Sequence, residues 1–337
     1  MPIRRELATA LAAALGMTLG SAALAANPPA TPTATPTPAA VATPSRPDLV
    51  RLVRLKLSAA DLASAEAWTE DWKREYGPDA TWLDARAWLA RGAWMLHQYD
   101  RALAFAGEVR AAIGEPKPEL LIPLGAALEV EGRILAERAG EAPAAAFFRE
   151  VETLSPDAAF RSRMWKNINR LELVGQAAPA LTIADHVGPI PPSLAALRGR
   201  PVLLFLWNYR CGDCRASAPT LAALHDRYAD KGLAILAPTR LSGTINDGKA
   251  ATPAEEKAEI ARELATTYKG TPDLVAPIGT ETMIRYGASA TPTFVLIDGE
   301  GIVRLYEPTR LTIAALSAAI EPLLAPPASA ADSVKVL

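Results

Sequence analysis

The fold is decided by the stretch Val202-Leu203-Leu204-Phe205-Leu206-Trp207-Asn208-Tyr209-Arg210-Cys211-Gly212-Asp213-Cys214-Arg215. Its first residues are apolar and predict a buried strand, and a helical stretch follows the cysteines. Cys211 and Cys214 are the only cysteines in the chain. A strand followed by C-x-x-C and then a helix strongly indicates dithiol redox chemistry.

The spacing of the cysteines suggests a role for each sulfur. Both lie at the start of one predicted helix, close enough to form a disulfide with little backbone movement. Cys211 is near the free N–H groups of the first turn, which favour its thiolate. We therefore expect Cys211 to attack a substrate disulfide and Cys214, one turn further in, to resolve the mixed disulfide.

Three other uses of the pair are weaker. A structural disulfide that closes so small a ring removes only about 2 kcal/mol of unfolded-state freedom. A zinc site needs more ligands, and His225 is roughly 16 Å further along a helix from Cys214. Haem attachment requires histidine where the chain has Arg215. We expect neither a metal nor a dissociable cofactor.

The residues around the motif alternate between short apolar runs and helical stretches, which predicts an α/β sandwich. A polar, glycine-bearing stretch at 241–252 predicts a mobile surface loop, and 298–301 predicts a tight turn. Strands are expected at 201–207, 233–237, 273–276, 293–298 and 302–306, and helices at 211–228, 253–268, 281–286 and 311–324.

Residues 48–173 have helical apolar spacing, with breaks at 77–78, 114–118, 140–143 and 155–156. The runs 99–105 and 147–157 are similar to helices of tetratricopeptide repeats, although the match is degenerate. Aromatic stripes at helical spacing usually face a core, so core filling is favoured over a peptide groove for five tryptophans. They are Trp68, Trp72, Trp82, Trp88 and Trp94.

The amino-terminal residues predict export. Residues 1–25 have an arginine pair, an apolar run and a small-residue cleavage site, which are typical of a secretory signal peptide. An uncleaved membrane anchor is the alternative. A Pro/Thr/Ala-rich linker at 26–47 and a flexible tail at 326–337 complete the predicted organisation. The predicted location is the periplasm.

Length and charge limit the other classes of function. The 337 residues suggest two domains, at roughly 100 to 200 residues each. The formal net charge of -2 leaves no basic field for phosphates, so nucleic acid is not an expected partner.

Four segments together resemble the thioredoxin superfamily and, within it, the exported TlpA/ResA-like thiol-disulfide oxidoreductases: 175–179, 197–207, 214–219 and 286–298. The resemblance implies a thioredoxin-like domain at 174–325, with a central mixed sheet flanked by helices. It follows the all-α domain of helical hairpins that the apolar spacing predicts at 48–173. The resemblance also implies that 175–179 is the opening strand of the thioredoxin-like domain, and that Pro292 is cis and faces the cysteines. The backbone of Thr291 would then pair with an extended substrate, and Trp207 joins these two as a substrate-contact candidate.

The chain departs from the family pattern at three positions. Arg210 stands where relatives often have an aromatic residue, Asp213 where they often have proline, and Phe205 where thioredoxins have a buried acid. Arg210 and Arg215 would stabilise the Cys211 thiolate and Asp213 would oppose it, each by on the order of 1 kcal/mol. Which effect dominates stays open.

The resemblance implies a periplasmic thiol-disulfide oxidoreductase, acting as a reductase on protein substrates and supplied by a membrane thiol-relay donor. The helical domain would then be free to bind a protein partner. The alternatives are a partner-recruiting adaptor with a redox-idle thioredoxin-like domain, or an oxidase or isomerase of the same fold. A thiol peroxidase would need proline and threonine where this chain has Leu204 and Asn208, so that activity is not expected.

Overall fold

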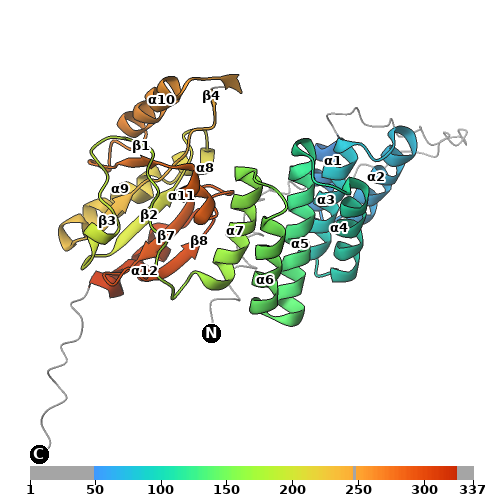
Figure 1. Ribbon diagram of the computed structural model, residues 1–337, viewed down its shortest axis with the longest axis horizontal. Helices are drawn as coiled ribbons and strands as arrows, with labels where there is room; N and C mark the ends of the chain where they lie inside the picture. The colour runs from blue at the N-terminus through green and yellow to red at the C-terminus, as the bar shows by residue number, and fades with distance from the viewer. Residues whose placement is uncertain (1–48, 246–247, 325–337) are drawn as a thin grey trace, which may run out of the picture. The chain divides into compact units, whose positions relative to one another are not determined.

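The computed structural model describes residues 49–245 and 248–324 (Figure 1). The predicted signal peptide, the linker and the tail lie outside the described residues. The predicted division into two domains is likewise untested and stays a prediction. Below, residues 49–172 are called the helical part and residues 185–324 the sheet-containing part.

Residues 49–172 contain helices and no strands, as the apolar spacing predicted. The four predicted breaks separate neighbouring helices, but the chain also breaks at two sites that carry neither glycine nor proline. At these sites Ala60 and His97 adopt left-handed backbone conformations, with φ of 56° and 57°. The α-helices are α1 (Leu49–Ser58), α2 (Leu62–Tyr76), α3 (Ala80–Met95), α4 (Tyr99–Ile113), α5 (Leu121–Ala139), α6 (Glu141–Glu152) and α7 (Ala158–Glu172).

Three of these helices begin at an aspartate that caps them. The carboxylates of Asp61, Asp79 and Asp157 each accept a hydrogen bond from a backbone N–H of the first turn. Such a bond satisfies a donor that has no partner within the helix. Local sequence therefore fixes where α2, α3 and α7 start.

Tryptophans fill much of the helical core. Trp72 and Trp82 are buried, and Trp68, Trp88 and Trp94 pack against the same core while remaining partly exposed. Core filling was thus the right interpretation for the first two. The tetratricopeptide likeness is not tested: 99–105 lies in α4, and α6 ends at Glu152, before Pro156.

The sheet-containing part is built on a four-stranded mixed sheet in the order β3-β2-β7-β8. Its strands are β2 (Val202–Leu206), β3 (Ala234–Leu236), β7 (Thr293–Ile297) and β8 (Val303–Glu307). β2 runs parallel to β3 and antiparallel to β7, so Leu206 at the end of β2 pairs with Thr293 at the start of β7. Residues that follow β2 and residues that precede β7 therefore meet at one edge of the sheet.

Alternate residues of the buried strand β2 face opposite layers, as expected for a strand covered on both sides. Leu203 and Phe205 share a core with α9 (Ala218–Tyr228) and α12 (Ile313–Leu324). Val202 and Leu204 share the other core with α11 (Thr280–Arg285). The predicted α/β sandwich is confirmed.

Several predicted boundaries were wrong. The helix expected over 211–228 is two helices, α8 (Gly212–Arg215) and α9, because Pro219 takes the first turn of a new helix. The loop expected at 241–252 contains a short hairpin, β4 (Thr244–Ile245) with β5 (Lys249–Ala250). It leads into α10 (Pro253–Thr266), which begins at a capping box made by Thr252 and Glu255.

Two strand predictions were also displaced. The opening strand expected at 175–179 makes only an isolated bridge, between Ala177 and Ile302. The strand expected at 273–276 is β6 (Ala276–Ile278), which pairs with β1 (Asp185–Val187), a strand not predicted. A turn at Asp273, with φ of 63°, delays the start of β6.

All the described residues belong to one compact unit. α7 contacts α11 directly: the Ser162 hydroxyl donates to the carbonyl of Met283, and the Asn169 amide donates to the carbonyl of Arg285. No helix among the described residues is long and apolar enough to cross a membrane.

Candidate active site

The cysteine pair lies where the central strand meets the next helix. β2 is buried along its whole length, and the chain turns after Trp207 and Asn208 into α8. Cys211 is the N-cap residue of α8, and its Sγ accepts a hydrogen bond of 3.1 Å from the backbone N–H of Cys214. The first turn thus supplies a donor to the Cys211 sulfur, as the spacing predicted.

Cys211 and Cys214 form a disulfide bond, with their Cα atoms 5.1 Å apart. The two sulfurs differ in access, because Cys211 is half-buried whereas Cys214 is completely buried. An attacking substrate thiolate must reach a sulfur atom, so Cys211 is the accessible member of the pair.

The loop before β7 faces the cysteines. The Thr291–Pro292 peptide bond is cis, which confirms that expectation from the family resemblance. The carbonyl oxygen of Thr291 lies 3.2 Å from Cys211 Sγ. On the other side of the bond, the Thr293 hydroxyl donates to the carbonyl of Ala290 and closes the loop. The structure therefore brings Cys211, Cys214, Thr291 and Pro292 together.

The arginines beside the pair have other partners. The Arg210 guanidinium donates to the hydroxyls of Thr244 and Ser242 in the hairpin region. The Arg215 guanidinium pairs with the carboxylate of Glu263 at 3.0 Å. Both guanidinium groups therefore bind oxygen atoms and not the Cys211 sulfur. This weakens the stabilisation of the Cys211 thiolate that we expected from them.

Asp213 and Trp207 occupy contrasting positions. Asp213 is exposed, and its backbone carbonyl accepts a hydrogen bond from the Ser217 hydroxyl. Trp207 is buried, with 1% of its surface exposed, and its indole N–H donates to the carbonyl of Ala237. Trp207 therefore belongs to the core, and the structure does not place it on a surface that a substrate can reach.

Sequence reasoning missed two buried acids on α10. Glu256, Ile260 and Glu263 are spaced so that they share the buried face of that helix. Burial would raise the pKa of Glu256, but donors from Ser242 and Gly243 hold that pKa below its ordinary value. A glutamate pair on an amphipathic helix is normally interpreted as its solvent face, so the sequence carried no signal for them.

The fold and the site define a class. A mixed sheet covered by helices, with a C-x-x-C disulfide after its central strand and a cis-proline loop facing it, is a thioredoxin-like domain. Residues 174–306 match the model of the AhpC/TSA family. This part of the chain is similar to thiol-disulfide oxidoreductases of the ResA type, the resemblance that the motifs indicated.

Individual relatives carry matching descriptions. The thiol-disulfide oxidoreductase ResA of Oceanobacillus iheyensis is 34% identical over 23% of this chain and 42% of its own length. ResA of Bacillus cereus is 27% identical over 39% of this chain and 66% of its own length. The matches therefore span less than two thirds of either relative.

Solved structures of similar description were also found. A thioredoxin-like superfamily protein is 23% identical, with a TM-score of 0.37 over 44% of this chain and 97% of its own. A thiol:disulfide interchange protein of the thioredoxin family from Chlorobium tepidum is 15% identical, with a TM-score of 0.35 over 46% of this chain and 98% of its own.

Proposed function

We propose that this protein is a thiol-disulfide oxidoreductase that reduces disulfides of protein substrates. The observation that carries the proposal is the Cys211–Cys214 disulfide, whose accessible sulfur lies 3.2 Å from the carbonyl oxygen of Thr291 beside cis-Pro292. A substrate chain paired with the Thr291 backbone would present its own sulfur to Cys211. The ResA relatives support the same chemistry.

The two cysteines can supply both electrons of the reaction, so no cofactor is needed. In the reduced protein, the Cys211 thiolate attacks one sulfur of the substrate disulfide, and the other substrate sulfur leaves as a thiolate and takes up a proton. The Cys214 thiolate then attacks Sγ of Cys211, forms the Cys211–Cys214 disulfide and releases the second substrate thiol. Two electrons pass from the protein dithiol to the substrate, which gains two protons.

The assignment of roles follows from access and hydrogen bonding. Cys214 is fully buried and cannot meet a large substrate first, whereas Cys211 is partly exposed. The Cys214 N–H donates to Cys211 Sγ, and a donor of this kind lowers the pKa of a free thiol because it favours the thiolate. Cys211 is therefore the nucleophile and Cys214 the resolving residue.

The reductase direction requires a supply of electrons. We place the protein in the periplasm, where each turnover leaves the pair as a disulfide and the oxidising environment keeps it in that state. A dithiol donor must then reduce it, and a membrane thiol-relay protein fits that chemistry. The location rests on the signal-like residues 1–25.

Reduction of insulin by dithiothreitol, followed as turbidity, tests the activity. We expect the wild-type protein to accelerate the reaction and Cys211→Ser to lose the acceleration, because the nucleophile is gone. Cys214→Ser should accumulate mixed disulfides instead of turning over. A purely adaptor role would leave the uncatalysed rate unchanged for all three proteins, and normal turnover by either variant would overturn the assignment.

A further inference from the structure

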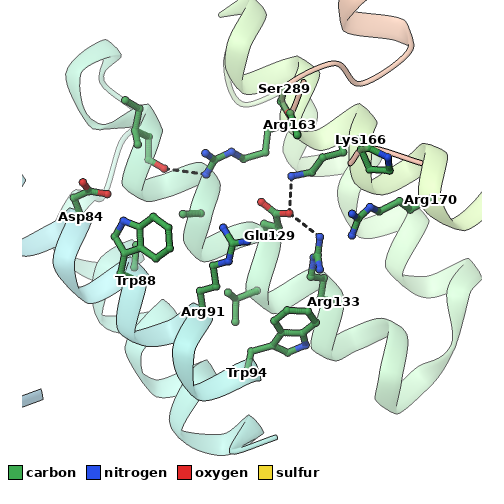
Figure 2. Close-up of a pocket in the computed structure, with 16 residues that line it drawn as sticks. Asp84, Trp88, Arg91, Trp94, Glu129, Arg133, Arg163, Lys166, Arg170 and Ser289 are labelled. Atoms are coloured by element: carbon green, nitrogen blue, oxygen red, sulfur yellow. Dashed lines mark hydrogen bonds and ion pairs between the residues drawn. The ribbon is translucent and has the colours of Figure 1, made fainter. Parts of the chain in front are cut away.

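A charged cavity of about 290 Å³ lies where three helices meet the loop that leads to Thr291 (Figure 2). α3, α5 and α7 provide most of its wall, and Ser289 and Ala290 close one side. Trp88 and Trp94, predicted to be core residues, both line it.

Each helix contributes one face to the cavity, because its lining residues repeat at intervals of three and four. α5 contributes Glu129 and Arg133, and α7 contributes Arg163, Lys166 and Arg170. The sequence of each helix alone looks like an ordinary charged face. The cavity exists only because the fold turns these faces toward one another, as the labelled side chains in Figure 2 show.

Positive charge dominates the lining. Five cationic side chains line the cavity against two carboxylates, Asp84 and Glu129, which gives a net charge of +3 when all are ionised. The cationic residues are Arg91, Arg133, Arg163, Lys166 and Arg170.

The carboxylates do not neutralise this charge. Glu129 is bound by Lys166 at 2.8 Å and by Arg133 at 3.0 Å. Among the described residues, no carboxylate lies within ion-pair distance of the other three cationic groups. They are Arg91, Arg163 and Arg170.

The titration behaviour of the lining supports a positive site at neutral pH. Burial lowers the pKa of Lys166 to about 8 although Glu129 opposes the shift, so the amine is still mainly protonated at pH 7. Burial also raises the pKa of Asp84 above its ordinary value, against the attraction of Arg163. Burial likewise raises the pKa of Glu307, the residue before the lining residue Pro308, although Arg170 is near it.

The chain segment that lines the cavity continues directly into the cis-proline loop. Ser289 and Ala290 line it, and the next two residues are Thr291 and Pro292, which face Cys211. A substrate strand paired with Thr291 advances about 3.3 Å per residue, so it reaches the level of Ser289 within a few residues.

We propose that this cavity binds acidic side chains of the protein substrate whose cysteine is engaged at Cys211. The inference rests on the proposed function and names the substrate class: polypeptides with Asp or Glu near the reactive cysteine. Guanidinium groups bind carboxylates through paired hydrogen bonds. Arg163 donates one bond, to the carbonyl of Ile122 at 3.3 Å, and Arg91 lies over the Trp88 ring, so both keep further N–H donors for a ligand. The same field repels basic segments.

Binding is tested with cysteine-free peptides, so that no exchange is needed. Two synthetic peptides of equal length carry serine in place of cysteine, flanked in one by a run of glutamates and in the other by glutamines. Calorimetry with the full chain in its disulfide form should show the glutamate peptide binding on the order of tenfold more tightly, the effect of about 1.4 kcal/mol. The preference should fall as salt is added.

Variants locate the site. Arg163→Gln, Arg170→Gln and Arg91→Gln should each reduce the preference for glutamate several-fold. Arg74→Gln, on α2 and with a 75% exposed side chain, is the matched control and should keep the full preference. Should Arg163→Gln fail to fold, the exposed residues Arg91 and Arg170 still decide the question. Equal binding of both peptides by the wild type, or an unchanged preference in the folded variants, would overturn the inference.

A second measurement separates this inference from the proposed function. The same peptides, now with cysteine as a mixed disulfide to a reporter thiol, are reacted with the reduced full chain. Faster release from the glutamate peptide supports both proposals. Release at the same rate from both peptides overturns the acidic site and leaves the oxidoreductase intact. No release from either peptide, together with glutamate-selective binding, contradicts the oxidoreductase and supports the acidic site.

Discussion

At the residue scale, Gly287 determines how closely the end of α11 approaches α7. Its φ is +63°, a conformation that other residues rarely adopt. A Cβ atom at this position would lie 2.3 Å from the backbone nitrogen of Lys166 and 2.4 Å from its Cα. Because both are backbone atoms, no flexible side chain can move aside to make room.

We predict that Gly287→Ala lowers the free energy of unfolding by at least about 2 kcal/mol, because it adds both backbone strain and a collision. Gly107→Ala is the matched control, since Gly107 lies within α4 and a Cβ there meets nothing within 4 Å. It should stabilise the protein by roughly 0.5 to 1 kcal/mol. Urea denaturation measures both, and an unchanged midpoint for Gly287→Ala would refute the argument.

The residues of the site were predictable to the extent that their chemistry is local. The C-x-x-C spacing and the sequence around Pro292 identify the reactive sulfurs and the cis-proline loop without any knowledge of the fold. The partners of Arg210 and Arg215 were not predictable, because Thr244 and Glu263 are 34 and 48 residues away in the chain. Side-chain direction over such separations is set by tertiary packing.

At the element scale, an ion cluster joins α5 to α7. Burial by itself would raise the pKa of Glu129, but Lys166 and Arg133 hold that pKa at about 2. The Glu129 side chain is 15% exposed, so solvent screens these interactions weakly. A carboxyl whose pKa is lower in the folded protein stabilises the fold while it is ionised.

The stability that Glu129 contributes is therefore fully present above its unfolded-state pKa of 4.5 and is lost as the pH falls toward 2. We predict that Glu129→Gln destabilises the protein at neutral pH by on the order of 3 kcal/mol, since it leaves the buried Lys166 and the half-buried Arg133 without their carboxylate. The difference between variant and wild type should shrink between pH 4.5 and 2. Urea titrations across this range measure it; a constant difference would contradict the coupling.

Most elements followed from periodicity, and the failures have local causes. The turns at Ala60 and His97 were missed because neither residue usually adopts a positive φ. Backbone hydrogen bonds close both helix ends there, from Asp61 N–H to the carbonyl of Lys56 and from Gln98 N–H to the carbonyl of Ala93. One kinked helix was expected over 211–228 instead of two helices, because Pro219 is compatible with a kink as well as with the first turn of a new helix. The β4–β5 hairpin has only two residues in each strand, too few to show alternation.

At the scale of the whole molecule, α7 links the helical part to the sheet-containing part. Ser162 and Asn169 donate hydrogen bonds to backbone carbonyls of α11, at 3.2 and 2.8 Å, and both donors are buried. Loss of either part would leave these groups without partners, which is costly in the protein interior. The contacts therefore couple the stability of the two parts.

We predict one cooperative unfolding transition for the full chain. Six of the seven tryptophans lie in the helical part, so fluorescence follows that part, whereas calorimetry follows both. The two midpoints should coincide in the wild type, and Asn169→Ala should lower both together. Two separated calorimetric transitions in the wild type would contradict the coupling.

The architecture was predictable from the sequence, but the charged cavity was not. The C-x-x-C and cis-proline motifs sufficed for the thioredoxin-like class, and apolar spacing sufficed for the helices before it. The cavity combines faces of α3, α5 and α7 with Ser289, and nothing local places those faces together. For the same reason, Trp88 could not be distinguished from a fully buried tryptophan such as Trp72.

The central claim is that Cys211 and Cys214 exchange electrons in that order with a protein substrate. The most direct test is peptide mapping by mass spectrometry of the mixed disulfides that Cys211→Ser and Cys214→Ser form with insulin. The account predicts a substrate sulfur attached to Cys211 in the Cys214→Ser protein and no adduct in Cys211→Ser. An adduct at Cys214 of the Cys211→Ser protein, with none at Cys211 of the other, would contradict it.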